Sequence, residues 1–257
     1  MKRILFFTYG VVCYAIFFAT FCYAVGFVGN LWVPKSIDSE PTTSAGTALA
    51  VNLLLLAVFA VQHSVMARPA FKRVWTRIVP RPIERSTYVL FTSLALILLV
   101  VFWQPMGLTI WNVASSGGRA ILYGIFAFGW LLVLVSTFMI NHFDLFGLRQ
   151  VYLYLLGRPY KHIGFQTPAL YKYIRHPLYV GWFLAFWATP TMTAAHLVFA
   201  LGTTAYSLVA ILFEERDLES FHGHPYRQYR SSVPMFIPRM AKFEASPSSK
   251  QETATAS

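Results

Sequence analysis

Charged and aromatic residues gather in two short segments near the end of this chain. The first segment, 171–181, has the sequence YKYIRHPLYVG, and the second contains Glu214 and Glu215. An arginine can pair with a carboxylate, and glutamates can accept hydrogen bonds from ribose hydroxyls or an exocyclic amine. These residue types predict a site for a ligand that carries a carboxylate, a ribose, a base and a positive centre.

Backbone groups and aromatic rings add to this predicted site. Pro177 suits the first position of a helix, and the free N–H groups of that turn favour an anionic partner. A competing interpretation is that the tyrosines and arginines are only anchors at a membrane surface. The combination in one hairpin favours binding, and the residues expected to bind the ligand are Tyr173, Arg175, His176, Pro177, Tyr179, Gly181, Glu214, Glu215, Tyr226 and Tyr229.

Three further residues are candidates for proton transfer. His142 and Asp144 follow an apolar run, and His162 lies in the next loop. A histidine oriented by a carboxylate is a common general base, so we predict His142 as base and Asp144 as its orienting partner. In the alternative, Asp144 pairs only with Arg149, and His142 only interacts with the end of its helix.

The composition places these residues in a membrane protein. Of the 257 residues, 56% are hydrophobic and only 12% are charged, and the mean hydropathy is +0.53. Soluble domains carry about 25% charged residues. Several apolar runs also reach the roughly 20 residues that span hydrocarbon, which argues against a soluble helical core.

The runs predict an all-α polytopic fold with five to six transmembrane helices. The last two form a helical hairpin that turns near residues 189–191, and the fifth is short for a full span. One domain should cover 1–240, with the ligand-binding part at about 141–240, and the Ser-, Thr- and Ala-rich tail 241–257 should be disordered. The predicted helices are 4–33, 48–66, 87–104, 119–140, 177–190 and 193–213.

The net charge of +11 comes mainly from two loops. Loops 67–86 and 141–176 are rich in Lys and Arg, whereas 34–47 and 105–118 are not. The positive-inside rule therefore predicts that both basic loops and both termini are cytoplasmic, in the inner membrane. The charge is explained by topology and contact with lipid headgroups, without a nucleic-acid partner.

The motif resembles a known membrane superfamily. The resemblance to the isoprenylcysteine carboxyl methyltransferase-like superfamily rests on residues 175–181, Glu214, Glu215, Tyr226, Tyr229 and Pro234. Segments 62–68 (QHSVMAR), 84–88 (ERSTY) and 141–151 (NHFDLFGLRQV) resemble the bacterial methanethiol methyltransferase family more closely. The resemblance implies S-adenosyl-L-methionine as cofactor, methanethiol as substrate and dimethyl sulfide as product.

Such a reaction is an in-line displacement by a thiolate on a sulfonium methyl group. Other interpretations remain open at this point: a prenylated cysteine or other lipid-linked acceptor, a nicotinamide-dependent membrane reductase, or a transporter. A b-type haem protein is a further alternative, with His63 and His142 as axial ligands. No motif requires a metal, although His63, His142, Asp144 and His162 could gather around one. The sequence does not fix the oligomeric state.

Overall fold

The computed structural model describes residues 1–238 and confirms an all-α membrane fold. Within that part of the chain, five helices are long and apolar enough to cross a membrane. The tail that the sequence predicts to be disordered lies outside the described residues. The five helices are α1 (Lys2–Gly29), α2 (Ala45–Ala67), α4 (Arg81–Phe102), α5 (Ser116–Ile140) and α9 (Ala194–His222).

The fifth predicted helix, α8 (Pro177–Trp187), is much shorter than a membrane span, as the sequence indicated. Its 11 residues are about 16 Å long, roughly half of the hydrocarbon thickness. The chain turns after it, as predicted, and α9 then runs back beside α8. The predicted end at residue 190 is wrong because the backbone leaves helical geometry at Ala188.

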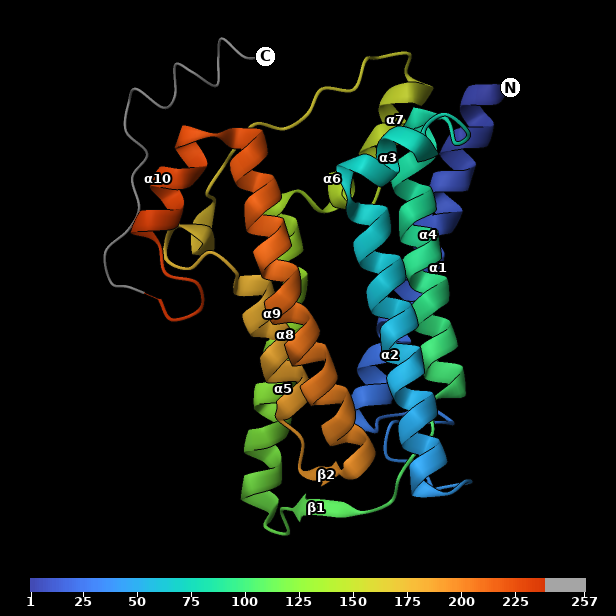
Figure 1. The fold of residues 1–257 in the computed structure, drawn as a ribbon, viewed down its shortest axis with the longest axis vertical. Helices are drawn as coiled ribbons and strands as arrows, with labels where there is room; N and C mark the ends of the chain where they lie inside the picture. The colour runs from blue at the N-terminus through green and yellow to red at the C-terminus, as the bar shows by residue number, and fades with distance from the viewer. Residues whose placement is uncertain (239–257) are drawn as a thin grey trace.

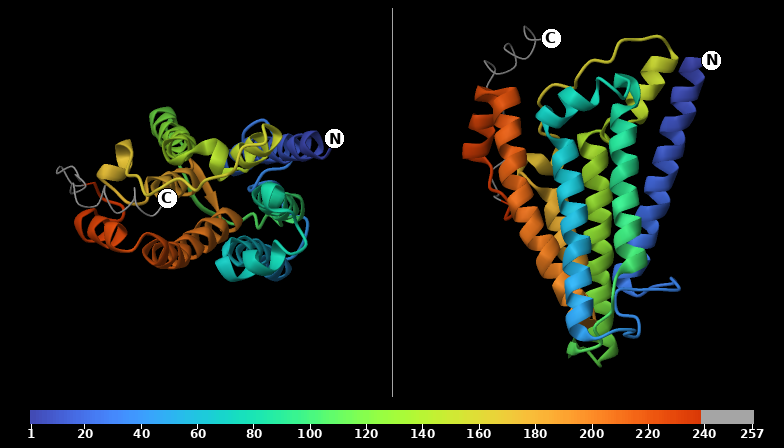
Figure 2. Two further views of the ribbon diagram at one scale, coloured as in Figure 1. Left: turned by 90° about the horizontal axis from the view of Figure 1, so that it is seen from above. Right: turned by 45° about the vertical axis from the view of Figure 1, so that its right-hand side comes forward.

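The long helices form two groups that converge at one end. Figure 1 shows α1, α2 and α4 in one group and α5, α8 and α9 in the other. We call the end that holds the N-terminus the basic end, because the Lys- and Arg-rich loops lie there. The opposite end, where both groups meet, is the strand end (Figure 2).

Short elements occupy the loops, and the sequence did not predict them. At the basic end they are α3 (Pro69–Trp75), α6 (His142–Leu145), α7 (Leu148–Leu155), the 3-10 helix η1 (Ala169–Lys172) and α10 (His224–Ser232). At the strand end, β1 (Thr109–Asn112) pairs antiparallel with β2 (Thr191–Thr193). This pairing fixes the turn of the α8–α9 hairpin.

A buried polar cluster ties the same turn to the loop after α1. Asp38 lies 3.1 Å from Nδ1 of His196, accepts a hydrogen bond from Asn30 at 2.7 Å and is bonded to the Thr193 hydroxyl. His196 is fully buried. These contacts give His196 a structural role at the strand end.

Two glycines set the position of α8 against α5. A Cβ on Gly181 would lie 2.8 Å from the carbonyl oxygen of Gly129, and a Cβ on Gly129 would lie 2.6 Å from the nitrogen of Ala185. The backbones of α5 and α8 can come this close only because neither residue has a side chain. This contact places the motif loop, which precedes α8, against the basic half of α5.

Candidate active site

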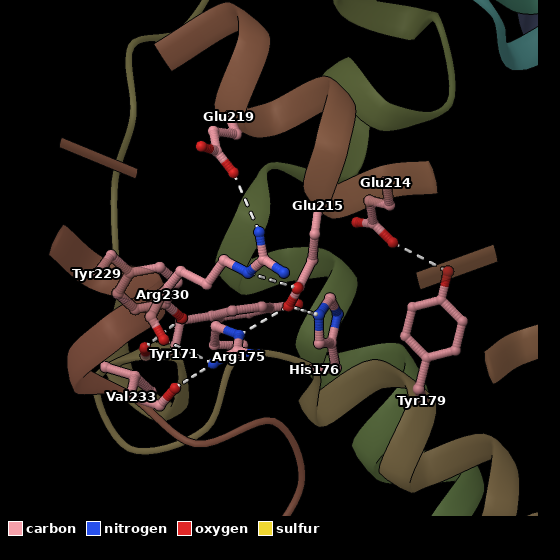
Figure 3. A network of polar contacts seen from close by, with 10 residues as sticks. All are labelled: Tyr171, Arg175, His176, Tyr179, Glu214, Glu215, Glu219, Tyr229, Arg230 and Val233. Atoms are coloured by element: carbon pink, nitrogen blue, oxygen red, sulfur yellow. Dashed lines mark hydrogen bonds and ion pairs between the residues drawn. The ribbon is translucent and has the colours of Figure 1, made fainter. Parts of the chain in front are cut away.

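The α8–α9 hairpin brings the two charged segments of the sequence together, as predicted. Nε of Arg175 donates to Oε1 of Glu215 at 2.7 Å, and Nε2 of His176 lies 3.0 Å from the same oxygen (Figure 3). Nε of Arg230, on α10, pairs with Oε2 at 3.0 Å. The Glu215 side chain is only 2% exposed. This carboxylate is therefore saturated by the protein itself.

Arg175 also holds the segment that follows α10. Its guanidinium donates to the carbonyl of Arg230 at 2.8 Å and to that of Val233. The backbone N–H of Arg175 donates to the carbonyl of Pro234 at 2.9 Å, and that of His176 to Met235 at 3.2 Å. Arg175 and its neighbours thus fasten the last described residues to the motif loop.

Two tyrosines of α10 complete this frame. Tyr226 and Tyr229 are buried against Phe165 and Val233. The Tyr229 hydroxyl donates to the Tyr171 carbonyl at 2.7 Å. Burial raises the pKa of both tyrosines above the ordinary value, so they stay neutral hydrogen-bonding groups. We call Arg175, His176, Glu215, Tyr226 and Tyr229 the frame.

Glu214 differs from Glu215 in its surroundings. Its Oε2 accepts a hydrogen bond from the Tyr179 hydroxyl at 2.9 Å (Figure 3). Within residues 1–238, no ion pair joins Glu214 to a lysine or arginine. Burial, with Glu214 adding to the effect, raises the pKa of Tyr171 as well. An uncompensated carboxylate between two phenols can accept hydroxyl donors or stabilise a cation.

Further tyrosines lie between Glu214 and the helix group that contains α2 and α4. Tyr179 lies in the neighbourhood of Tyr206 on α9 and of Tyr88 on α4. The Tyr88 hydroxyl in turn lies 3.0 Å from Nδ1 of His63 on α2. Sequence reasoning did not include Tyr88 or Tyr206 in the site, although Tyr88 belongs to segment 84–88, which carried the resemblance.

The remaining predicted binding residues shape the motif loop. Pro177 is the first residue of α8, as predicted, and is buried. Tyr173 is half-buried in the loop before it. Gly181 packs against α5, which accounts for the absence of a side chain there without a ligand. Contact of these residues with a cofactor stays a prediction.

The expected pairing of His142 with Asp144 differs from the structure. His142 is 3% exposed, and its two ring nitrogens lie 2.8 Å from the hydroxyls of Tyr14 and Thr137. Asp144 instead accepts a hydrogen bond from Arg149 at 2.8 Å. The two residues are two positions apart on the short helix α6 (His142–Leu145), and side chains at such spacing point to different sides of a helix.

His142 and His162 also lie in surroundings unlike those of a solvated proton-transfer site. Burial lowers the pKa of His142, whose ring stacks on Phe138 at a centroid distance of 4.2 Å. His162 is exposed and packs edge-on against Tyr160 and Phe221. A catalytic role for any of the three stays a prediction. In the described part of the chain, no three His, Cys, Asp or Glu side chains gather closely enough to hold a metal ion.

Comparisons with known proteins give consistent relatives. A methanethiol S-methyltransferase of Crocosphaera subtropica is 60% identical over 234 residues, which cover 91% of this chain and 92% of the relative. One of Mycobacterium tuberculosis is 56% identical over 238 residues, 93% of this chain and 98% of the relative. Nurim of Xenopus laevis is 34% identical over 166 residues, 62% of this chain and 58% of its own length. No family model matches the chain, and no solved structure matches it.

Proposed function

The chain belongs to the methanethiol S-methyltransferase family, and from this premise we propose that it transfers a methyl group from S-adenosylmethionine to methanethiol, which yields dimethyl sulfide. The similarity to the Crocosphaera enzyme over 91% of the chain supports the reaction most directly. The aligned region of 234 residues includes parts of both helix groups.

The residues around Glu214 fit S-adenosylmethionine in charge and hydrogen bonding. Glu214 can accept hydrogen bonds from ribose hydroxyls, and the rings of Tyr171 and Tyr179 offer aromatic faces to a cation. We assign these three residues to cofactor contact and the frame to their positioning. When bound, S-adenosylmethionine supplies an electrophilic methyl group on a positively charged sulfur.

The frame, together with Arg230, also excludes water from the cofactor site. Arg175 and Arg230 both pair with Glu215, and Arg175 also donates to carbonyls at the end of α10, so α10 is held over the motif loop. Excluding water strengthens the attraction between the Glu214 carboxylate and a positive ligand. It also leaves the thiol as the nucleophile nearest to the methyl group.

The site lies at a depth that suits a small apolar acceptor. Glu215 precedes the end of α9 by seven residues, which places it about 10 Å from the basic end of that helix. We propose that the protein lies in the inner membrane with its basic end on the cytoplasmic side, from which the cofactor enters. A cysteine placed at His224 would then react with a membrane-impermeant maleimide only in inverted vesicles.

The reaction is tested by headspace gas chromatography of the purified full chain with S-adenosylmethionine and methanethiol. We expect dimethyl sulfide in proportion to active protein. A prenylated cysteine serves as the competing acceptor, and transfer to it in place of methanethiol would contradict the proposal. Equilibrium binding of S-adenosylmethionine, measured alongside, separates a wrong acceptor from a wrong cofactor.

A further inference from the structure

A cavity lies between α2 and α9, away from the frame and nearer the middle of the bundle. It has a volume of about 200 Å³ and is almost wholly apolar. A cavity of about 150 Å³ can hold a molecule as large as benzene, so this one is ample for a small thiol. Residues that line it include Leu56, Phe59, Ala60, Gly202, Thr203 and Tyr206.

Two contacts between α2 and α9 separate this cavity from water at the basic end. The hydroxyls of Ser64 and Tyr206 lie 3.1 Å apart, and Arg68 pairs with Asp217 at 2.9 Å. Both contacts lie between the cavity and the basic end, since residue numbers rise toward that end in both helices. Exposed apolar side chains such as Leu53 and Leu201 flank the cavity instead. Its access is therefore from the hydrocarbon.

His63 stands directly behind the lining of the cavity. Its ring stacks on that of Phe59 at 5.5 Å and meets that of Tyr206 edge-on at 6.4 Å. The Tyr88 hydroxyl is within 3.1 Å of both ring nitrogens, and that of Thr92 lies 3.2 Å from Nδ1. Ionisable residues inside membrane helices are rare and usually functional.

One residue that lines the cavity, Tyr206, lies on the same helix as Glu214. Tyr206 lies eight residues before Glu214 on α9, about 12 Å along the helix axis. A small molecule that moves from the cavity past Tyr206 would thus pass His63 before it reaches the cofactor site.

We propose that the α2–α9 cavity binds a short alkanethiol from the lipid phase and that His63 takes the thiol proton. The S–H bond breaks as the proton moves to the imidazole, and the thiolate sulfur forms the new S–C bond. The bond between the methyl carbon and the sulfonium sulfur breaks, and its electron pair stays on that sulfur, so charge balances. Thr92, at Nδ1, orients the imidazole, and Nε2 takes the proton in place of its contact with the Tyr88 hydroxyl. This inference rests on the proposed thiol methylation.

The test compares two thiols that differ in acidity, methanethiol and the more acidic 2,2,2-trifluoroethanethiol. A missing base should matter less for an acidic thiol, because more of it is already thiolate. We expect His63→Asn to lose about a hundredfold in kcat with methanethiol, far less with the fluorinated thiol, and nothing in S-adenosylmethionine affinity. An equal loss with both thiols would overturn the role of His63 as base.

Two further variants separate His63 from other histidines. His224→Asn changes an exposed residue on α10 and should leave both rates unchanged. His142→Asn tests the base expected from the sequence. If His142→Asn showed the acidity-dependent loss and His63→Asn did not, the assignment would move to His142 and the proposal would fail.

Binding in the cavity is tested without turnover. In cofactor-free protein, the ¹⁹F resonance of 2,2,2-trifluoroethanethiol should shift with wild type and not with Gly202→Leu, whose side chain would fill the cavity beside Leu56. Leu56→Ala, which enlarges it, should raise kcat/KM for longer thiols relative to methanethiol by about fourfold per added methylene. Equal shifts in both proteins, with unchanged chain-length preference, would place the thiol elsewhere. Wild-type dimethyl sulfide formation is measured separately, so a failed reaction is not mistaken for a misplaced cavity.

Discussion

Replacing Glu215 with alanine should loosen α10 and the segment after it. The substitution leaves the Arg175 side chain, only 11% exposed, without its carboxylate partner. Breaking a buried ion pair in this way destabilises by about 3–5 kcal/mol. Arg230 is 45% exposed, so its lost pair adds little. We therefore use the lower figure, about 3 kcal/mol, which corresponds to an opening roughly a hundredfold more frequent.

The assay is hydrogen–deuterium exchange of peptides that contain Arg175 and His176. Their amides donate to the carbonyls of Pro234 and Met235, so they report the docking of that segment. Glu219→Gln is the matched control: Glu219 is partly exposed, its pairs with Arg227 and Arg230 lie near the surface, and exchange should change less than fivefold.

Glu214→Gln should behave in the opposite manner. Exchange of the two amides should stay as in wild type, while S-adenosylmethionine affinity falls about tenfold or more, because a hydrogen bond to a charged group is lost. The reasoning is refuted if Glu215→Ala weakens cofactor binding without faster exchange. That result would make Glu215 a direct ligand, as the sequence alone suggested.

Three other substitutions test the parts around the site. Gly181→Ala should destabilise the protein by about 1–3 kcal/mol, because the added methyl group meets the Gly129 carbonyl. Thermal unfolding in detergent, followed by fluorescence, measures this loss, and an unchanged melting temperature would contradict the close α5–α8 contact. Although burial opposes it, bonding to His196, Thr193 and Asn30 lowers the pKa of Asp38. The ionised Asp38 therefore stabilises the folded protein fully above about pH 4, and this contribution is lost as the pH falls through the lowered pKa. Asp38→Asn should reduce the melting temperature at pH 7 and reduce it less in acid. Asp144→Ala should keep turnover if Asp144 only pairs with Arg149, and lost turnover with intact cofactor binding would restore its role in catalysis.

Much of the fold follows from hydropathy, because each span is an apolar run bounded by charge. The end of α1 at Gly29 was not predictable from hydropathy, because the apolar run continues to Val33. The helix ends there because the backbone of Asn30 is left-handed. The strands were missed for a similar reason. Thr109–Asn112 has few residues and no alternation, and it becomes a strand only because Thr191–Thr193 lies beside it.

The site was predictable in its residue types and only in part in their roles. The hairpin argument placed Arg175 beside Glu215, and the structure confirms this at 2.7 Å. Sequence alone could not show that Glu215 is saturated while Glu214 is not, because that difference arises from Arg230 of α10 folding back. Tyr206 was missed, and its proximity to His63 was not predicted, because that proximity depends on how two helix groups meet.

The shortness of α8 is what brings two unlike ligands to one depth. Residues 194–213 of α9 contain no Asp, Glu, Lys or Arg, and the charged residues begin abruptly at Glu214. A full-length α8 would carry Arg175 to the basic end, beyond the reach of Glu215. Because α8 has only 11 residues, the motif loop instead descends to the point where the apolar part of α9 ends. A charged cofactor from water and an apolar thiol from lipid can meet only at such a boundary.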